Sequence, residues 1–327
     1  MNPCLDEILT LSERPAWDVG GWLRDVFTMI SRIRRQRYDV LLDLHGVWLS
    51  HWIGWFSGAR SKLGLDKRND LGFRLFQYRR LPKGRKLHRV RLYLEPLEFL
   101  GIGPAEPAFP FQIPDTAQRR IDGFFQEHKI TAADVVVALH PGTAVAIKRW
   151  PADRFQELAD QLACRPGVKI ILVSGAADPA VRPASAAVIY APPLSHPELA
   201  GLLRRSDLVI GNDSGPLQLA AALGRPTVAI FGPSDSQITG PWGTQHRVIQ
   251  ADVPCRPCYG NFKIYFHCKR RTNACLQNIT VDQVFQVIVA RLTEIQLQKN
   301  LGRAPASASL SSNLTPLCGG LQTEHSD

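Results

Sequence analysis

Three loops in the second half of the chain carry polar side chains suited to binding a phosphorylated ligand. The first loop, residues 140–151, follows a predicted strand and contains Gly142, Thr143 and Lys148. A strand-end loop with a hydroxyl and a cation can hold a diphosphate, and Lys148 would neutralise charge on a departing phosphate. The alternative is that Lys148 and its neighbour Arg149 are ordinary surface charges before a helix.

The second loop has the sequence Asn-Asp-Ser-Gly-Pro at residues 212–216 and precedes a predicted helix of small residues. Free backbone N–H groups at the start of a helix suit a phosphate, and Asp213 can accept hydrogen bonds from sugar hydroxyls. Asp and Ser are also favoured at helix N-caps for purely structural reasons, which is the alternative here. The third loop, Gly-Pro-Ser-Asp at residues 232–235 followed by Thr-Gly-Pro-Trp-Gly at residues 239–243, by itself indicates only turns.

Predicted strands and helices alternate around these loops. The strands are short apolar runs, as expected of buried parallel strands, at residues 135–139, 168–173, 186–190, 208–210 and 226–231. Alternation of this kind predicts an α/β fold with a doubly wound parallel sheet, which binds its ligand at the carboxyl ends of the strands. All three loops follow such a strand.

The pattern along the chain predicts two domains, a last helix and a tail. Residues 1–115 are predicted to form one α/β domain and residues 116–280 a second, with a proline-containing linker at residues 101–114. Residues 281–299 are predicted to form a C-terminal helix, opened by a capping box of Thr280 and Gln283. Residues 300–327 are rich in Ser, Ala, Pro and Gly, and we expect a disordered tail there.

The charge balance favours anionic partners, and the alternative is a soluble protein that is simply basic. The 39 Lys and Arg against 29 Asp and Glu give a formal net charge of +10. The basic residues are scattered and no RNA- or DNA-binding motif is present, which argues against nucleic acid. A strongly basic stretch, residues 74–91, is predicted either to touch a phosphorylated lipid or an acidic membrane face, or to be a solvated basic surface.

The chain shows no signal peptide and no apolar run long enough to span a membrane. Its seven cysteines, an odd number, fit a reducing compartment better than a disulfide framework. We therefore expect a cytoplasmic protein, with peripheral contact to the inner face of the inner membrane as a further expectation.

Taken together, the loops resemble glycosyltransferase family 9, which includes the lipopolysaccharide heptosyltransferases. The resemblance spans residues 36–290 and rests on Lys-Arg-Trp-Pro at 148–151, Asn-Asp-Ser-Gly-Pro at 212–216 and the two loops that follow. It implies a GT-B fold, with two Rossmann-like domains facing across a cleft. It also implies inverting transfer of a heptose from ADP-heptose to a Kdo or heptose of the lipopolysaccharide inner core.

The resemblance also implies roles for individual residues, namely a catalytic Lys148 and a sugar-nucleotide site of Gly142, Thr143, Lys148, Asp213, Ser214, Gly215 and Gln218. The family usually has His where Gln218 stands. The sequence contains no Asp-x-Asp pair, which many metal-dependent transferases use to hold the diphosphate through a divalent ion. We therefore expect a metal-independent enzyme without a cofactor.

One family feature is missing from the start of the chain. The family normally begins with a strand and a Ser-Leu-Gly-Asp loop whose Asp is the catalytic base, and neither is found here. Asp43 is the nearest substitute, and the first domain is expected to be incomplete. The alternative function is therefore a truncated, catalytically inactive sugar-nucleotide-binding homologue. A Rossmann-type oxidoreductase or epimerase is disfavoured, because no Gly-x-Gly-x-x-Gly follows a strand.

Four cysteines near the end of the second domain have the look of a zinc cluster. They are Cys255, Cys258, Cys268 and Cys275, and the spacing of the last two is loose. Any such zinc would be structural, because four cysteine ligands leave no open position. The alternative is a set of buried thiols or a surface hairpin.

Overall fold

The computed structural model describes residues 4–11, 18–64, 87–103, 106–175, 178, 181–259, 268 and 270–300. Contacts divide the chain into two compact units, one of residues 5–108 and one that begins at Phe109. The boundary falls inside the proline-containing stretch at residues 101–114. The basic stretch lies outside the described residues from 74 to 86, as does the tail from residue 301, so both expectations stay predictions.

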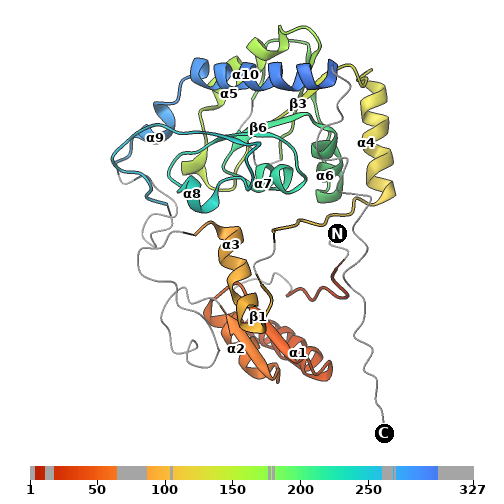
Figure 1. The fold of residues 1–327 in the computed structure, drawn as a ribbon, viewed down its shortest axis with the longest axis vertical. Coiled ribbons are helices and arrows are strands. Elements are labelled where there is room, and N and C mark those ends of the chain that lie inside the picture. Colours follow the sequence, from red (N-terminus) through yellow and green to blue (C-terminus); the bar gives the residue numbers. More distant parts are fainter. Residues whose placement is uncertain are drawn as a thin grey trace. The chain divides into compact units, whose positions relative to one another are not determined.

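The larger unit is built on a six-stranded parallel sheet in the order β5-β4-β3-β6-β7-β8 (Figure 1). The strands are β3 (Val135–His140), β4 (Val168–Leu172), β5 (Val188–Tyr190), β6 (Leu208–Asn212), β7 (Thr227–Ile230) and β8 (Arg247–Ile249). The sheet order reverses direction after β5, because the chain returns to pair β6 with the other side of β3. That reversal is the arrangement in which doubly wound sheets bind ligands.

Helices cover both faces of this sheet, as the alternation of strands and helices predicts. They are α4 (Asp115–Glu127), α5 (Ala152–Ala163), α6 (His196–Arg205), α7 (Gly215–Ala222), α8 (Ser236–Thr239), α9 (Ala274–Gln277) and α10 (Val281–Asn300). The predicted capping box is present, with Thr280 N donating to Gln283 Oε1 at 3.0 Å, and Ser195 and Glu198 form a second box, in which Ser195 N donates to Glu198 Oε2 at 2.7 Å. Each box satisfies backbone N–H groups that would otherwise lack partners at the helix start.

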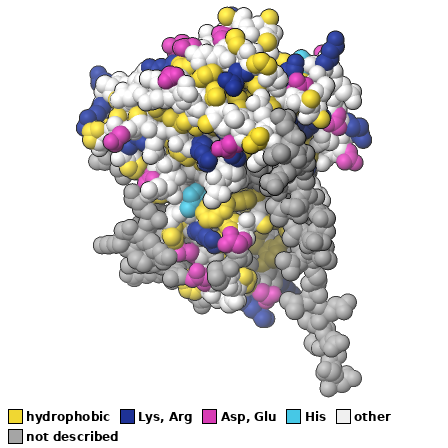
Figure 2. Space-filling view, turned by 45° about the horizontal axis from the view of Figure 1, so that its top comes forward, with side chains coloured by type: hydrophobic (Ala, Val, Ile, Leu, Met, Phe, Trp, Pro, Cys, Tyr) yellow, Lys and Arg dark blue, Asp and Glu magenta, His cyan; other side chains and the backbone are white. Residues whose placement is uncertain are grey.

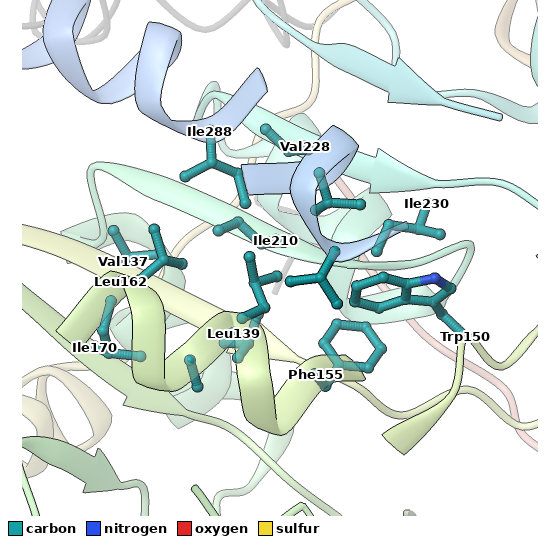
Figure 3. Packing of buried hydrophobic residues seen from close by; sticks show 14 of the residues in the cluster. Val137, Leu139, Trp150, Phe155, Leu162, Ile170, Ile210, Val228, Ile230 and Ile288 are labelled. Atoms are coloured by element: carbon teal, nitrogen blue, oxygen red, sulfur yellow. The ribbon is translucent and has the colours of Figure 1, made fainter. Parts of the chain in front are cut away.

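Alternating side chains of the strands feed two separate cores. Val137 and Leu139 of β3 face α5 and α10, whereas Val136 and Ala138 face α4, α6 and α7. Figure 3 shows the first core, in which the rings of Trp150 and Phe155 meet edge to face at 4.9 Å. Burying a side chain of this size stabilises the fold by about 1.5–3 kcal/mol. These cores hold the strand ends, and hence the loops, in fixed positions.

The smaller unit contains two parallel strands among its described residues, β1 (Val40–Asp43) and β2 (Ser61–Gly64). Its helices are α1 (Val19–Arg35), α2 (Trp48–Phe56), α3 (Arg89–Leu94) and the 3₁₀ helix η2 (Glu95–Leu100). The helical stretch of α3 and η2 therefore changes from α to 3₁₀ geometry partway. Pro96 lies at the start of η2 and lacks the N–H that a continuing α-helix needs.

Two further observations concern the outside of the protein. Figure 2 shows Lys and Arg side chains interspersed with Asp and Glu over the visible part of the larger unit, without one large basic patch. Among the described helices, none has the length and apolar character needed to cross a bilayer.

Candidate functional site

The three predicted loops converge at one edge of the six-stranded sheet. Strands β3, β6 and β7 are neighbours and run in parallel, so the loops that follow them leave from the same edge. The loop after β3 contributes Thr143 and Lys148, the loop after β6 contributes Asp213, and the loop after β7 contributes Ser234. The sheet thus gathers side chains that are far apart in the sequence.

Asp213 is the centre of this cluster. Lys148 Nζ lies 2.7 Å from Asp213 Oδ2, and Ser234 Oγ donates to the same oxygen at 2.6 Å. Thr143 Oγ1 donates to the backbone carbonyl of Asp213 at 3.2 Å. The side chains of Lys148 and Asp213 are only 14% and 9% exposed. Burying charges is costly unless they are paired, so these contacts hold all three loops together.

Lys148 is positioned by the backbone on both sides of it. It ends the 3₁₀ helix η3 (Ala146–Lys148), and two residues later Trp150 N donates to Asn212 Oδ1 at 3.0 Å. Asn212 Nδ2 in turn donates to Pro141 O at 2.7 Å, which ties the loop after β3 to the end of β6. Lys148 Nζ also lies 4.0 Å from the centroid of the Tyr259 ring, a cation–π contact. Lys148 is therefore not an ordinary surface charge.

The second loop starts helix α7, and its serine does not serve as a side-chain cap. Ser214 occupies the N-cap position with an extended backbone but makes no side-chain capping hydrogen bond. Its hydroxyl is buried and has no hydrogen-bond partner within the described part of the chain. Buried polar groups normally have partners. A buried hydroxyl without one, at a helix start with free backbone N–H groups, indicates a place for a ligand acceptor such as a phosphate oxygen.

The two glycines of the predicted site have different surroundings. A Cβ on Gly142 would come within 2.1 Å of the Asp178 carboxylate, so a larger residue there would require the Asp178 side chain to move. Asp178 also accepts a hydrogen bond from Gly175 N at 2.6 Å, beside the end of β4. A Cβ on Gly215 would meet open space, so its backbone is accessible at the start of α7.

A buried cation, a helix N-terminus and a buried hydroxyl at one sheet edge can together bind the phosphates of a nucleotide. The comparison with known families decides which class of nucleotide-using protein this is: the sequence model of glycosyltransferase family 9 (heptosyltransferase) matches residues 26–268. The chain belongs to glycosyltransferase family 9.

Individual relatives support this assignment. The chain is 28% identical to lipopolysaccharide heptosyltransferase 1 of Pseudomonas aeruginosa over 299 residues, 84% of this chain and 78% of that protein. The structure is similar to a family 9 glycosyl transferase from Veillonella parvula, with a TM-score of 0.72, 23% identity and coverage of 90% and 84% of the two chains. It is also similar to E. coli heptosyltransferase WaaC with ADP, with a TM-score of 0.60, 22% identity and coverage of 84% and 80%.

The family assignment confirms the predicted fold class and the predicted enzyme class. The chain has the α/β GT-B fold with parallel sheets, as in the solved heptosyltransferase structures. It is a glycosyltransferase of the heptosyltransferase family.

Gln218, which stands where family 9 usually has His, lies one turn inside α7. Its backbone N donates to Ser214 O at 3.2 Å, and its side-chain Nε2 donates to Thr239 O at 2.8 Å. The amide therefore links α7 to the Thr-Gly-Pro-Trp-Gly loop. No contact joins it to Lys148 or Asp213 among those found in the described residues.

Asp43, the strand-end carboxylate named above as a candidate base, is held in a structural network. Its buried carboxylate accepts hydrogen bonds from His45 N at 3.0 Å, Gly46 N at 2.9 Å and Ser50 Oγ at 2.8 Å. His51 Nε2 lies 3.5 Å from the same carboxylate. This carboxylate closes the turn between β1 and α2, which accounts for its burial.

Three residues of the cluster were missed by reasoning from sequence. Ser234 lies in a loop whose pattern indicated only a turn, and Tyr259 and Arg256 belong to a segment that was considered only for its cysteines. Arg256 donates hydrogen bonds to the backbone of the same loop, including Ser234 O at 3.3 Å. No spacing along the sequence signals these contacts, because Arg256 and Tyr259 are distant along the chain from Lys148 and Asp213.

The four cysteines are unequal in burial. Cys275 is buried, and the other three are half-buried. Burial, together with the neighbouring Cys258 and Cys255, raises the pKa of the Cys275 thiol to about 11. Within the described residues, no three His, Cys, Asp or Glu side chains are arranged to hold a metal ion. The structure thus contains no preformed site there, and the zinc cluster stays a prediction.

Proposed function

We propose that this chain is an inverting, metal-independent glycosyltransferase that moves a heptose from ADP-heptose to the inner core of lipopolysaccharide. The observation that carries the proposal is the buried Lys148–Asp213 pair beside the Ser214 hydroxyl at the start of α7, which has no hydrogen-bond partner among the described residues. The relatives support the choice of donor and acceptor, because they include lipopolysaccharide heptosyltransferases and a heptosyltransferase with ADP.

The proposed chemistry is a single displacement at the anomeric carbon of the heptose. An acceptor hydroxyl forms the new C–O bond and loses its proton to a base, while the bond from the anomeric carbon to the diphosphate breaks and ADP leaves. Negative charge grows on the diphosphate as it departs. In this proposal Lys148 and the N–H groups at the start of α7 stabilise that charge, the role that a divalent ion has in other transferases.

The remaining site residues bind and orient the donor in this proposal. Thr143 and Gly142 line the diphosphate, Ser214 and Gly215 present a hydroxyl and backbone N–H groups, and Asp213 accepts hydrogen bonds from the sugar. Asp213 also holds Lys148, so one carboxylate couples sugar binding to the position of the cation.

The experiment is calorimetric titration of ADP, followed by a transfer assay with ADP-heptose and a Kdo-containing lipid acceptor. We expect ADP to bind in the presence of a chelator and Lys148→Met to weaken it by at least tenfold. Lys169→Met, which removes a lysine from β4, is the matched control and should bind ADP like the unaltered protein. Equal affinity of the Lys148→Met variant and the unaltered protein would overturn the proposal.

A second candidate function is binding of the sugar nucleotide without transfer. The two functions separate in the same assays. ADP binding together with turnover of ADP-heptose supports transfer, whereas ADP binding with no sugar transferred or hydrolysed supports the binding function.

A further inference from the structure

The segment Arg256–Tyr259 lies against the loop that follows β7, and we call it the clamp segment. The Arg256 guanidinium donates to Gly232 O through Nε and to Ser234 O through Nη2 at 3.3 Å. Its other donors reach Ala251 O at 3.1 Å and Gln250 Oε1 at 2.8 Å. One planar group thus links two carbonyls of the site loop to the strand-end region after β8.

The clamp segment also holds the carbonyl between those two. Pro233 O accepts hydrogen bonds from the backbone N of Cys258 and of Tyr259, both at 3.0 Å. Three consecutive carbonyls, from Gly232 to Ser234, are therefore bonded to the clamp segment. A loop with all its carbonyls engaged cannot change its path without breaking several hydrogen bonds at once.

These contacts close a circuit through the site. Ser234 Oγ donates to Asp213 Oδ2, Asp213 pairs with Lys148 Nζ, and Nζ lies over the ring of Tyr259. Tyr259 belongs to the clamp segment, so this series of contacts begins at the loop after β7 and ends at the segment that binds the same loop. The Lys148 ammonium group thus lies between the Asp213 carboxylate and the face of the Tyr259 ring. Both Asp213 and Tyr259 are connected through the loop that follows β7.

We propose that Arg256 and Tyr259 are positioning residues of the donor site, an inference that rests on the proposed role of Lys148 in binding the diphosphate. Tyr259 holds the ammonium group through its ring face, and Arg256 holds Ser234 where it can orient Asp213. A positioned cation does not have to reorganise when the diphosphate binds or when charge develops during transfer. Both residues thus act on the ligand through Lys148 and Asp213 rather than by touching it.

Substitution of Tyr259 tests the aromatic contact. Tyr259→Phe keeps the ring, and we expect its ADP affinity and kcat to stay within about twofold of the unaltered protein. Tyr259→Leu removes the ring and should weaken ADP binding by about threefold to thirtyfold, the range expected for loss of a partly desolvated cation–π contact. Tyr190→Leu is the matched control, because it removes an exposed tyrosine from β5 of the same unit.

Substitution of Arg256 tests the link through the loop. Arg256→Gln should weaken ADP binding by about tenfold. Arg256→Lys should show most of the same loss, because lysine keeps the charge but lacks the planar guanidinium that contacts several carbonyls at once. Arg247→Gln is the control, because Arg247 also donates to loop carbonyls, at Thr244 and His246, but not to the site loop. Thermal unfolding without ADP identifies variants that fail to fold. If the Arg256 variants fail to fold, the comparison of Tyr259→Phe with Tyr259→Leu tests the inference by itself.

A measurement without nucleotide separates this inference from the proposed function. The rate at which an acylating reagent modifies Lys148, followed by peptide mass spectrometry, should rise at least threefold in Tyr259→Leu and stay unchanged in Tyr259→Phe. If the unaltered protein binds no ADP, the proposed function fails, and this rate still judges the positioning role. Equal Lys148 reactivity in all variants, or unchanged ADP affinity in Tyr259→Leu and Arg256→Gln, overturns the inference.

Discussion

The pairing of Lys148 with Asp213 makes a double-mutant cycle the sharpest test of the site. Lys148→Met removes the cation and leaves a buried carboxylate without it. Asp213→Asn removes the carboxylate charge, and the Lys148→Met/Asp213→Asn variant removes both charges with little change in volume. The cycle tests whether Lys148 contributes to the stability of the fold, to the affinity for ADP or to both.

The expected magnitudes differ between folding and binding. Both side chains are more than four-fifths buried, so breaking the pair from one side should cost about 3–5 kcal/mol of unfolding free energy. The double variant has no unpaired charge and should recover at least half of that loss. Loss of a charged hydrogen-bond donor to the diphosphate costs about 1.5–3 kcal/mol, which weakens ADP about tenfold to 150-fold. That loss should remain in the double variant, because the cation is still absent.

Urea unfolding and calorimetric titration of ADP give the two free energies for each variant. Stability that returns in the double variant while ADP affinity does not would establish that Lys148 contributes to both. Recovery of ADP affinity along with stability would refute the reasoning, because Lys148 would then act only through the fold. So would a Lys148→Met variant as stable as the unaltered protein.

Three other predictions follow from the larger unit. Hydrogen bonds from the Ser195 backbone N–H, the larger cause, and from the Arg120 side chain lower the pKa of Glu198 to about 2. The ionised Glu198 carboxylate therefore stabilises the folded protein above about pH 4.5, and this stabilisation is lost as the pH falls through 2. The Tm difference between the unaltered protein and Glu198→Gln should therefore shrink over that range, and a pH-independent difference would contradict it. Gly211→Ala places a Cβ 2.5 Å from His140 O and should lower the free energy of unfolding in urea by about 3 kcal/mol. An unchanged free energy of unfolding would contradict this close approach of Gly211 to His140. Trp150→Phe removes the 3.0 Å bond from Nε1 to Ile279 O and should cost about 1–3 kcal/mol, whereas an unchanged Cm would refute a role for that bond.

Much of the fold of the larger unit follows from local patterns. Short apolar runs such as residues 135–139 are buried on both sides, and the capping residues Ser195 and Thr280 mark helix starts wherever the helix later packs. These signals depend on the side-chain period and on nearest neighbours, so the sequence alone determines them. The same holds for the position of Lys148 and Asp213 in loops that follow strands, and hence for their expected meeting at one sheet edge.

Only the tertiary structure decided which partners complete the cluster. The order of strands places the loop after β7 beside the loop after β6, which gives Asp213 the hydroxyl of Ser234. The return of the chain after β8 then brings Arg256 and Tyr259 to the same loop. Contacts between segments this distant depend on the packing of the whole sheet rather than on any local spacing.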